Sequence, residues 1–515
     1  MKIKKIVDFA KTGLIYLLTA SMLAMAGFYI NARQNAGQNE EIPREKIRIF
    51  EIGGMALAEI NENHITPLQI TITANKQTFT AIYNDRTVLD IYEHGIKNNI
   101  RDIFGKNSAC RILSGAEGEE LWRRCADSEK SIYVKYAGNY IYPFIYTFLA
   151  KESIKNLAEG FSGELAMVRE LFIIDDGEIK GVAKDIYDRV SLFEPPPEAK
   201  SKIRQRFGET DLSAYKNIAG AVPCEFLKNR DISLQTGANE NDIKNLKFSE
   251  TFHLFQNYEK YSFVLEYSNP LSGEDGKIKI EREYIKNLLK ILNFNIENSV
   301  SYSENDAMTF RDGKNTIKFF KNGQILYAYK PIDSNEIGGG LHLAKFLSYD
   351  DSYYTYYEKI KAASVFVSSL DRELAGNECK IYLKEVNMNP IGEMTAIFSY
   401  YYEGAEIKIN GSSEAVALTI GENGFTQIKI NSLYVTLSEQ GMVKNRNPIF
   451  DLDTIDREIS RERGELREIE EIARKYNLRY DEKSDKFLVS DFKLVYEIDY
   501  DQKSGNFAKA VWEVN

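Results

Sequence analysis

The residues of this chain with the clearest potential for chemistry are its histidines, its clustered carboxylates and one run of glycines. The four histidines are spread along the sequence: His64, His94, His253 and His342. Zinc hydrolases place histidines at short helical spacing, as in HExxH, and serine hydrolases carry their nucleophile in GxSxG. Neither pattern occurs in the sequence. We therefore expect the histidines to be structural or to face solvent.

The glycine run Gly338-Gly339-Gly340 precedes the segment LHLAKFL. Backbone N–H groups at the start of a helix attract anions, so the run could be a phosphate-binding loop. A P-loop also needs a Lys-Ser/Thr pair after the glycines and an apolar strand leading into them. Both features are missing here, and a turn before the next helix is the favoured interpretation.

Carboxylates cluster at Asp175-Asp176, at Asp350-Asp351, and at Asp451, Asp453 and Asp456. A general acid–base pair needs two carboxyls converging in one pocket, which spacing alone does not establish. The first pair precedes Gly177 and predicts a turn, and Asp453 is placed to cap a helix. The run DLDTID lacks the central Gly and the terminal Glu of a calcium loop.

Two tyrosine clusters could form a peptide- or glycan-binding platform, because exposed tyrosines favour interfaces. The alternative is that they pack between a helix and a sheet, which is the interpretation we favour. The clusters comprise Tyr353, Tyr354, Tyr356 and Tyr357, and Tyr400, Tyr401 and Tyr402.

Length and composition point to a folded protein of two to four domains. The chain has 515 residues, 43% of them hydrophobic, and its formal net charge is −10. A 515-residue chain is too long for one ordinary core. Phosphate binding needs a concentrated basic surface, whereas lysine and arginine are scattered here, so we expect no nucleic-acid partner.

The N-terminus predicts a membrane anchor. Residues 12–32 carry no charged side chain, and a helix of that length is about 30 Å long, enough to cross a bilayer. Residues 1–11 form a basic tail that predicts a cytoplasmic N-terminus and an extracytoplasmic body. Its lysines are Lys2, Lys4, Lys5 and Lys11. A cleaved signal peptide is the alternative, because Ala24-Met25-Ala26 has the form of a cleavage site.

The four cysteines are Cys110, Cys125, Cys224 and Cys379. None forms a CxxC pair, so the sequence does not support a zinc or thioredoxin-like site. Cys110 and Cys125 are compatible with a disulfide that closes a loop of about fifteen residues and adds about 3 kcal/mol. They are equally compatible with two buried thiols.

Beyond the anchor the pattern predicts an α+β protein. Residues 33–46 look like a polar stalk, and residues 47–245 form a first extracytoplasmic α+β domain. Residues 250–445 form a second α+β domain, and residues 450–515 a C-terminal helix with antiparallel strands. Helical spacing followed by period-two alternation recurs about three times, which is typical of helices that each cover an antiparallel sheet.

This layout resembles the extracytoplasmic regulators YycH and YycI, which accompany the WalK sensor kinase of Gram-positive bacteria. SIYVKYAGNYIYPFIYTFLA at 131–150 is similar to a segment of the first YycH domain, and GEMTAIFSYYYEGAEIKI with AVALTIGENGFTQIKI to the YycI sheet. The ending DYDQKSGNFAKAVWEV resembles the closing hairpin of PepSY-like domains.

The resemblance implies a non-catalytic, single-pass membrane protein that modulates a sensor histidine kinase in the cell envelope, alone or with a YycH/YycI-type homologue, and without a cofactor. Regulation would pass through the membrane helix. Its candidate contact residues are Leu14, Leu17, Leu18 and Met22, with the small residues Ala20, Ala24 and Gly27 permitting close approach. An envelope enzyme or enzyme inhibitor acting on glycan or peptide is the alternative, and a structural envelope or spore protein is a third.

Overall fold

The structure is a computed structural model, and its described residues all belong to the second of two compact units, Ala56–Asn515. They are residues 62–74, 77–82, 92–150, 161, 164–209, 222–228, 244–248, 252–256, 265–272, 277–279, 283–296, 298–304, 306–330, 340–347, 354–373, 378–388, 393–402, 404–437, 452–464, 468–475, 478–489, 492–500, 507–508 and 510–514. The predicted tail, anchor and stalk lie outside them. Among the described residues, no helix combines the length and the apolar character needed to cross a membrane.

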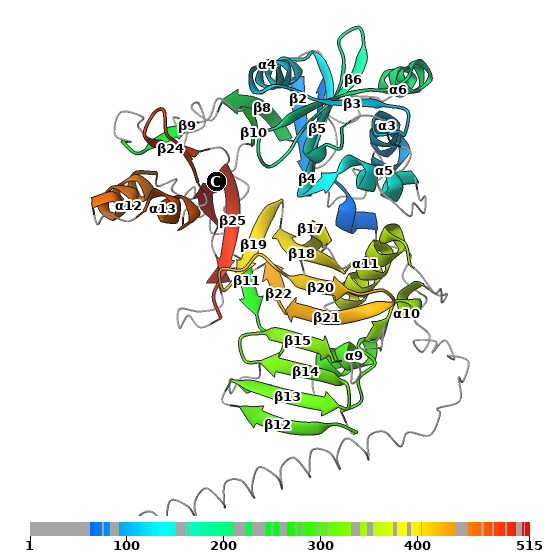
Figure 1. The fold of residues 1–515 in the computed structure, drawn as a ribbon, viewed down its shortest axis with the longest axis vertical. Coiled ribbons are helices and arrows are strands. Elements are labelled where there is room, and N and C mark those ends of the chain that lie inside the picture. Colours follow the sequence, from blue (N-terminus) through cyan, green and yellow to red (C-terminus); the bar gives the residue numbers. More distant parts are fainter. Residues whose placement is uncertain are drawn as a thin grey trace, which may run out of the picture. The chain divides into compact units, whose positions relative to one another are not determined.

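The first part of the described chain forms a nine-stranded sheet in the order β10-β8-β2-β1-β4-β5-β6-β7-β3 (Figure 1). Each neighbouring pair in it is antiparallel. The strands are β1 Gln69–Ala74, β2 Gln77–Ile82, β3 Ala109–Ile112, β4 Lys130–Ile141, β5 Met167–Asp175, β6 Ile179–Lys184, β7 Val190–Glu194, β8 Val222–Lys228 and β10 Phe252–Gln256. The sequence prediction of α+β architecture is confirmed here.

Helices pack on both faces of this sheet. On one face, strand residues such as Val134 and Ile173 join a core with the helical segments η2, α3, α5 and α6. Tyr133 and Phe172, one position away on the same strands, pack on the other face against Trp122 of α4. The helical segments are η2 Tyr92–Ile96, α3 Lys97–Ile103, α4 Gly115–Ala126, α5 Tyr142–Ala150 and α6 Pro197–Glu209. Because successive side chains of a strand point to opposite faces, the same strands contribute to two separate hydrophobic cores.

A twelve-stranded sheet contains most of the later strands, in the order β12-β13-β14-β15-β21-β20-β18-β19-β25-β27, with β16 on β21 and β17 on β18. Its strands are β12 Val300–Glu304, β13 Ala307–Asp312, β14 Asn315–Phe320, β15 Gln324–Tyr329, β16 Leu341–His342, β17 Lys380–Met388, β18 Met394–Tyr402, β19 Ala405–Ile409, β20 Val416–Ile420, β21 Gly424–Asn431, β25 Phe492–Ile498 and β27 Ala510–Val514. The DG and NG pairs produce hairpin turns in which Gly313 and Gly323 have φ of +52° and +82°, as turns of this kind require.

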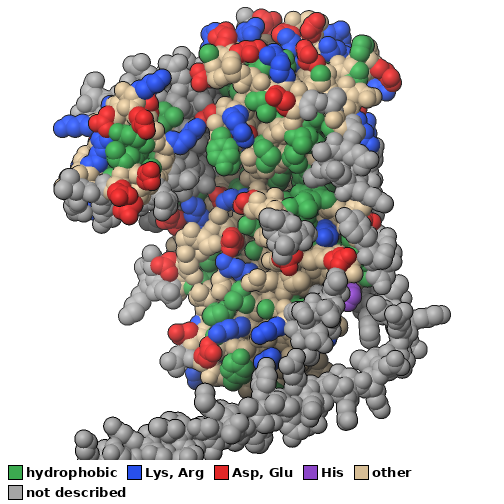
Figure 2. Space-filling model, viewed as in Figure 1, with side chains coloured by type: hydrophobic (Ala, Val, Ile, Leu, Met, Phe, Trp, Pro, Cys, Tyr) green, Lys and Arg blue, Asp and Glu red, His purple; other side chains and the backbone are tan. Residues whose placement is uncertain are grey.

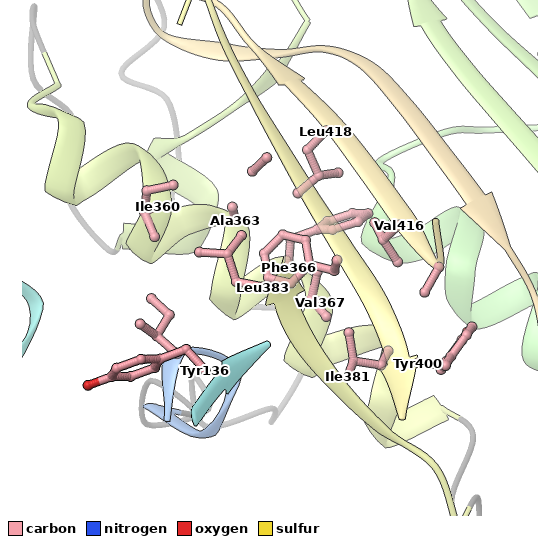
Figure 3. Packing of buried hydrophobic residues seen from close by; sticks show 14 of the residues in the cluster. Tyr136, Ile360, Ala363, Phe366, Val367, Ile381, Leu383, Tyr400, Val416 and Leu418 are labelled. Carbon is pink, nitrogen blue, oxygen red and sulfur yellow. The ribbon is translucent and has the colours of Figure 1, made fainter. Parts of the chain in front are cut away.

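Helix α11, Tyr356–Glu373, covers one face of this second sheet. Ile360, Ala363 and Phe366 on the helix point toward Leu383 and Leu418 on the strands (Figure 3). All five side chains are fully buried. Helix α9, Glu283–Ile291, packs beside α11, and Lys345 of the short helix α10, Ala344–Leu347, donates hydrogen bonds to the last carbonyls of α9.

Strands of different predicted extracytoplasmic regions share sheets: β10 of the second region pairs with β8 of the first, and β25 of the third pairs with β19 of the second. Strand β9, Leu246–Phe248, runs parallel to β24, Lys486–Val489, which pairs with β23, Arg479–Asp481. Strand β11, Leu265–Ser268, lies between β22, Tyr434–Leu437, and β26, Phe507–Ala508. The predicted terminal hairpin, β25 with β27, is confirmed, and β25 joins the second sheet parallel to β19. The remaining helices in the described part of the chain are η1 Glu62–Ile65, α12 Leu452–Gly464 and α13 Ile469–Lys475.

Two β-bulges meet where β4 contacts β17. The register of β4 against β5 shifts between Lys135 and Tyr140, and that of β17 against β18 shifts around Lys384. Between these bulges, the Tyr140 hydroxyl donates a hydrogen bond to the carbonyl O of Leu383. A Cβ at Gly138 would overlap the carbonyl O of Lys384. Only glycine permits so close a backbone approach at this point.

Candidate protein-interaction site

The hairpin between β6 and β7 carries a loop whose backbone is fixed by one carboxylate. The Asp185 side chain is buried, and its Oδ1 accepts hydrogen bonds from the backbone N of Tyr187 at 2.8 Å and of Arg189 at 3.0 Å. Its Oδ2 accepts from Nε of Arg189 at 2.7 Å. These are charge-assisted bonds, which are shorter and stronger than neutral ones. The residues Asp185–Arg189 are called the recognition loop below.

The backbone of the recognition loop is that of a three-residue hairpin connection. The N–H of Asp188 bonds the carbonyl of Asp185, and the N–H of Asp185 bonds the carbonyl of Arg189. Asp188 has φ of +59°, in the left-handed region. Hairpin loops of three residues commonly combine a turn with one left-handed residue, and Asp tolerates that conformation better than most residues.

The tip of the recognition loop presents apolar surface to solvent. Ile186 is 45% exposed and Tyr187 is 57% exposed. The guanidinium carbon of Arg189 lies 5.5 Å from the centre of the Tyr187 ring, within the range of a cation–π contact. Tyrosine and arginine are the residue types enriched at protein interfaces.

A buried ion pair supports the base of the loop. Lys184 Nζ lies 3.5 Å from Glu170 Oε2 and 3.8 Å from Asp188 Oδ1, and the Lys184 side chain is 3% exposed. The same Nζ lies 4.8 Å from the centre of the Trp122 ring. Lys184 and Glu170 are direct partners on the adjacent strands β6 and β5. Charges buried to this degree persist only when they are paired.

A contact from the C-terminal part of the chain completes the support. Arg479 of β23 donates a hydrogen bond of 2.9 Å to Oδ2 of Asp188. Because half of the Arg479 side chain is exposed, this ion pair contributes at most about 1 kcal/mol. Its effect is to link Asp188, and with it the loop, to a second element.

Of the four histidines, the structure describes the side chains of His64 and His342. His64 is buried, with its ring edge-on to Phe398 and its Nε2 3.8 Å from Asp371 Oδ2, whereas His342 is exposed. The side chains of His94 and His253 lie outside the described residues. Within the described part of the chain, no group of three or more His, Cys, Asp or Glu side chains could hold a metal ion.

Cys110 and Cys125 are free, buried thiols in the structure. Cys110 on β3 belongs to the core beneath α3, whereas Cys125 on α4 belongs to the core on the opposite face of the first sheet. Cys379 is also buried, and the side chain of Cys224 lies outside the described residues. The sequence left a disulfide and two buried thiols as alternatives for Cys110 and Cys125, and the structure contains the two buried thiols.

The described tyrosines of both clusters pack inside the protein. Tyr354 and Tyr400–Tyr402 are buried. Tyr356 and Tyr357 pack edge-on against Phe144 and Phe148 of α5. Tyr353 lies outside the described residues. The platform interpretation therefore does not hold for these side chains, and the packing interpretation does.

The glycine run and the carboxylates also have structural roles where they are described. Gly340 has φ of +113°, and a Cβ there would overlap the backbone of β21; its two preceding glycines lie outside the described residues. Asp175 binds Arg204, and Asp176 accepts the N–H of Glu178 within the predicted turn.

Asp456 of α12 is buried and accepts the backbone N–H groups of Lys244 and Asn245. The structure does not describe the side chains of the pair Asp350-Asp351 or those of Asp451 and Asp453. The transmembrane contact candidates also lie outside the described residues: Leu14, Leu17, Leu18, Ala20, Met22, Ala24 and Gly27.

The recognition loop is not evident from the sequence, because the pattern of KGVAKDIYDRV predicts a strand or a short helix after the DDG turn. The usable signal was an Asp at each end of an apolar pair, followed by Arg: DIYDR. Aspartates that bond backbone N–H groups favour turns over helices.

No protein-family model, curated protein or solved structure matches the chain.

Proposed function

We propose that the protein is a non-catalytic binding and regulatory protein, anchored by residues 12–32 and acting outside the membrane on a protein partner in the cell envelope. The proposal keeps the layout drawn from the sequence: one membrane helix followed by helix-on-sheet domains of the YycH, YycI and PepSY-like kind. The partner class is a two-component sensor histidine kinase of a Gram-positive envelope, reached directly or through a YycH/YycI-type homologue.

The observation that supports the proposal is the recognition loop. Its apolar tip, Ile186 and Tyr187, is exposed, while its backbone is held by Asp185. A loop that is already ordered loses little conformational entropy on binding, so more of the contact energy remains as affinity. Tyr187 supplies a large ring with few rotatable bonds, the property that makes tyrosine a frequent interface anchor.

The surface in view adds a second argument. Acidic and basic side chains are interspersed on it, with hydrophobic side chains reaching the surface among them (Figure 2). Because a protein interface is about as apolar as the rest of a protein surface, this mixture fits a protein partner without marking an interface, and it argues against nucleic acid. A nucleic-acid interface would concentrate positive charge.

The test reconstitutes the full chain in lipid vesicles with a two-component sensor histidine kinase of a Gram-positive envelope, the proposed partner class, and measures kinase autophosphorylation. Tyr187→Ala should weaken the effect of the protein by about tenfold in apparent affinity, which corresponds to about 1.4 kcal/mol. The matched control is Met388→Ala, since Met388 is 60% exposed on another sheet. Removing residues 12–32 while retaining export should abolish the effect in cells.

Equal activity of the wild-type, Tyr187→Ala and anchor-deleted proteins would overturn the proposal. If Met388→Ala weakens the effect as much as Tyr187→Ala does, the recognition loop is not the contact site and drops out of the proposal. Circular dichroism of each variant checks that the fold is retained, and the exposure of both side chains favours retention.

A further inference from the structure

Strand β12 is the end strand of the second sheet among the described strands, and its sequence gives that edge little protection. Among the described strands it pairs with β13 alone, beyond which the sheet continues to β14 and β15 (Figure 1). All five of its residues are exposed, with Val300 at 72% and Tyr302 at 50%. Edge strands are ordinarily blunted by proline, lysine or a bulge. β12 contains no proline, lysine or bulge, its one charged residue is the terminal Glu304, and its register against β13 is uninterrupted.

The register fixes which backbone groups of β12 face outward. Glu304 pairs with Ala307 across a two-residue connection, and such connections close on a hydrogen-bonded pair. Antiparallel partners exchange hydrogen bonds at every second residue, so Tyr302 and Val300 also bond to β13. The N–H and C=O groups of Ser301 and Ser303 therefore point away from the sheet.

We propose that β12 pairs with β12 of a second copy of the chain, antiparallel and about a two-fold axis through Tyr302. In this register Ser301 of one copy faces Ser303 of the other, and the outward groups of these serines form four backbone hydrogen bonds. Tyr302 faces Tyr302, in the closer, non-bonded type of pair. A two-fold interface requires a self-complementary segment, and Ser-Tyr-Ser is symmetric about its centre.

Charge supports a second copy over an unrelated extended segment. Val300 pairs with Arg311 in the chain's own sheet, and in the proposed register it faces Glu304 of the second copy. Arg311 and that glutamate then lie on the same face, about 10 Å apart between Cα atoms, within reach of their side chains. Among the described residues, exposed Arg311 donates a long hydrogen bond of 3.4 Å to the carbonyl of Gly313. Glu304 already pairs with Lys318 Nζ of its own sheet at 2.7 Å, so in the dimer its carboxylate is shared between Lys318 and Arg311 of the second copy. The contact occurs twice by symmetry.

A pair of five-residue strands buries much less than the roughly 1,600 Å² of a standard interface, so the association is weak and is best measured by disulfide trapping. The full chain carrying Tyr302→Cys is solubilised in detergent and treated with a mild oxidant. Covalent dimers are then detected by non-reducing electrophoresis. Non-bonded antiparallel partners have Cα atoms about 4.5 Å apart, which suits a disulfide. We expect Tyr302→Cys to form a covalent dimer and the wild-type chain to form none.

Two controls make the register itself testable. Ser301→Cys alone should not dimerise, because its Cα atoms would lie about 8 Å apart across the axis, beyond disulfide reach. A mixture of Ser301→Cys and Ser303→Cys chains should form the mixed dimer. Adding Ser303→Pro to Tyr302→Cys should abolish trapping while leaving the fold intact, because that N–H faces away from β13.

Arg311→Glu should slow trapping by placing like charges together, whereas Lys321→Glu on the adjacent turn should not. Absence of a Tyr302→Cys dimer overturns the proposal. Trapping of Ser301→Cys alone as fast as Tyr302→Cys also overturns it, because that result indicates random collision or another register.

Discussion

Replacing Glu170 with Gln should strongly destabilise the half of the first sheet that carries the recognition loop. Glu170 Oε2 and Lys184 Nζ are 3.5 Å apart, and at an effective dielectric constant of about 20 their attraction is about 5 kcal/mol. Desolvation of both groups offsets much of this in the wild-type protein. The variant retains the desolvation cost of Lys184 and loses its nearest counter-charge.

We therefore expect Glu170→Gln to lower the free energy of unfolding by about 3–5 kcal/mol, the range measured when one partner of a buried pair is removed. The variant Glu170→Leu/Lys184→Met should recover most of that loss, because no uncompensated charge remains. Asp188 keeps a partner in both variants, since Arg479 lies 2.9 Å from it.

The assay is urea unfolding followed by the emission of Trp122, whose ring lies 4.8 Å from Lys184 Nζ. The chain has two tryptophans, so all variants also carry Trp512→Phe to isolate the signal. A local probe is needed because a chain of this size does not have to unfold in one step. A loss below about 1 kcal/mol for Glu170→Gln, or a double variant no more stable than the single one, would refute the reasoning.

Two further predictions concern the buried thiols and the bulge contact. Burial raises the pKa of both Cys110 and Cys125 to about 12 from 9.0; stability that is complete below pH 9 should therefore fall as the pH rises toward 12. Thermal melts at increasing pH should show a smaller fall when both are replaced by Ala, and an equal fall would contradict this. Gly138→Ala should cost about 1–3 kcal/mol through overlap with β17, and Tyr140→Phe about 1 kcal/mol through one lost hydrogen bond. Differential scanning calorimetry measures both, with Gly115→Ala, which meets nothing within 4 Å, as the neutral control; Gly138→Ala melting with that control would contradict the overlap.

Local signals predicted the elements of the fold well where short-range chemistry decides them. The period-two segments at 69–82 and 307–329 are antiparallel strands, and the DG and NG pairs are the turns of the second segment. The helical spacing at 283–291 and 356–373 corresponds to α9 and α11. In each case a hydrophobic period or a residue that tolerates positive φ selects the local structure without help from distant residues.

Burial in the sheets depended on long-range packing. Tyr400, Tyr401 and Tyr402 are consecutive and therefore point to alternate faces of β18, yet all are buried. Two of them pack in the main core, and Tyr401 packs with Tyr382, Ala137 and Leu68. No local pattern encodes that both faces of one strand are covered.

The sequence by itself determined an α+β chain with known turns, an apolar 12–32 segment and no familiar catalytic motif, because these depend on neighbours within a few residues. Only the tertiary structure decided that Lys184 is buried beside Glu170 and Trp122, that Asp188 meets Arg479, and that β25 pairs in parallel with β19. Those contacts join residues from about fourteen to almost three hundred positions apart, and their partners are selected by packing and charge in three dimensions.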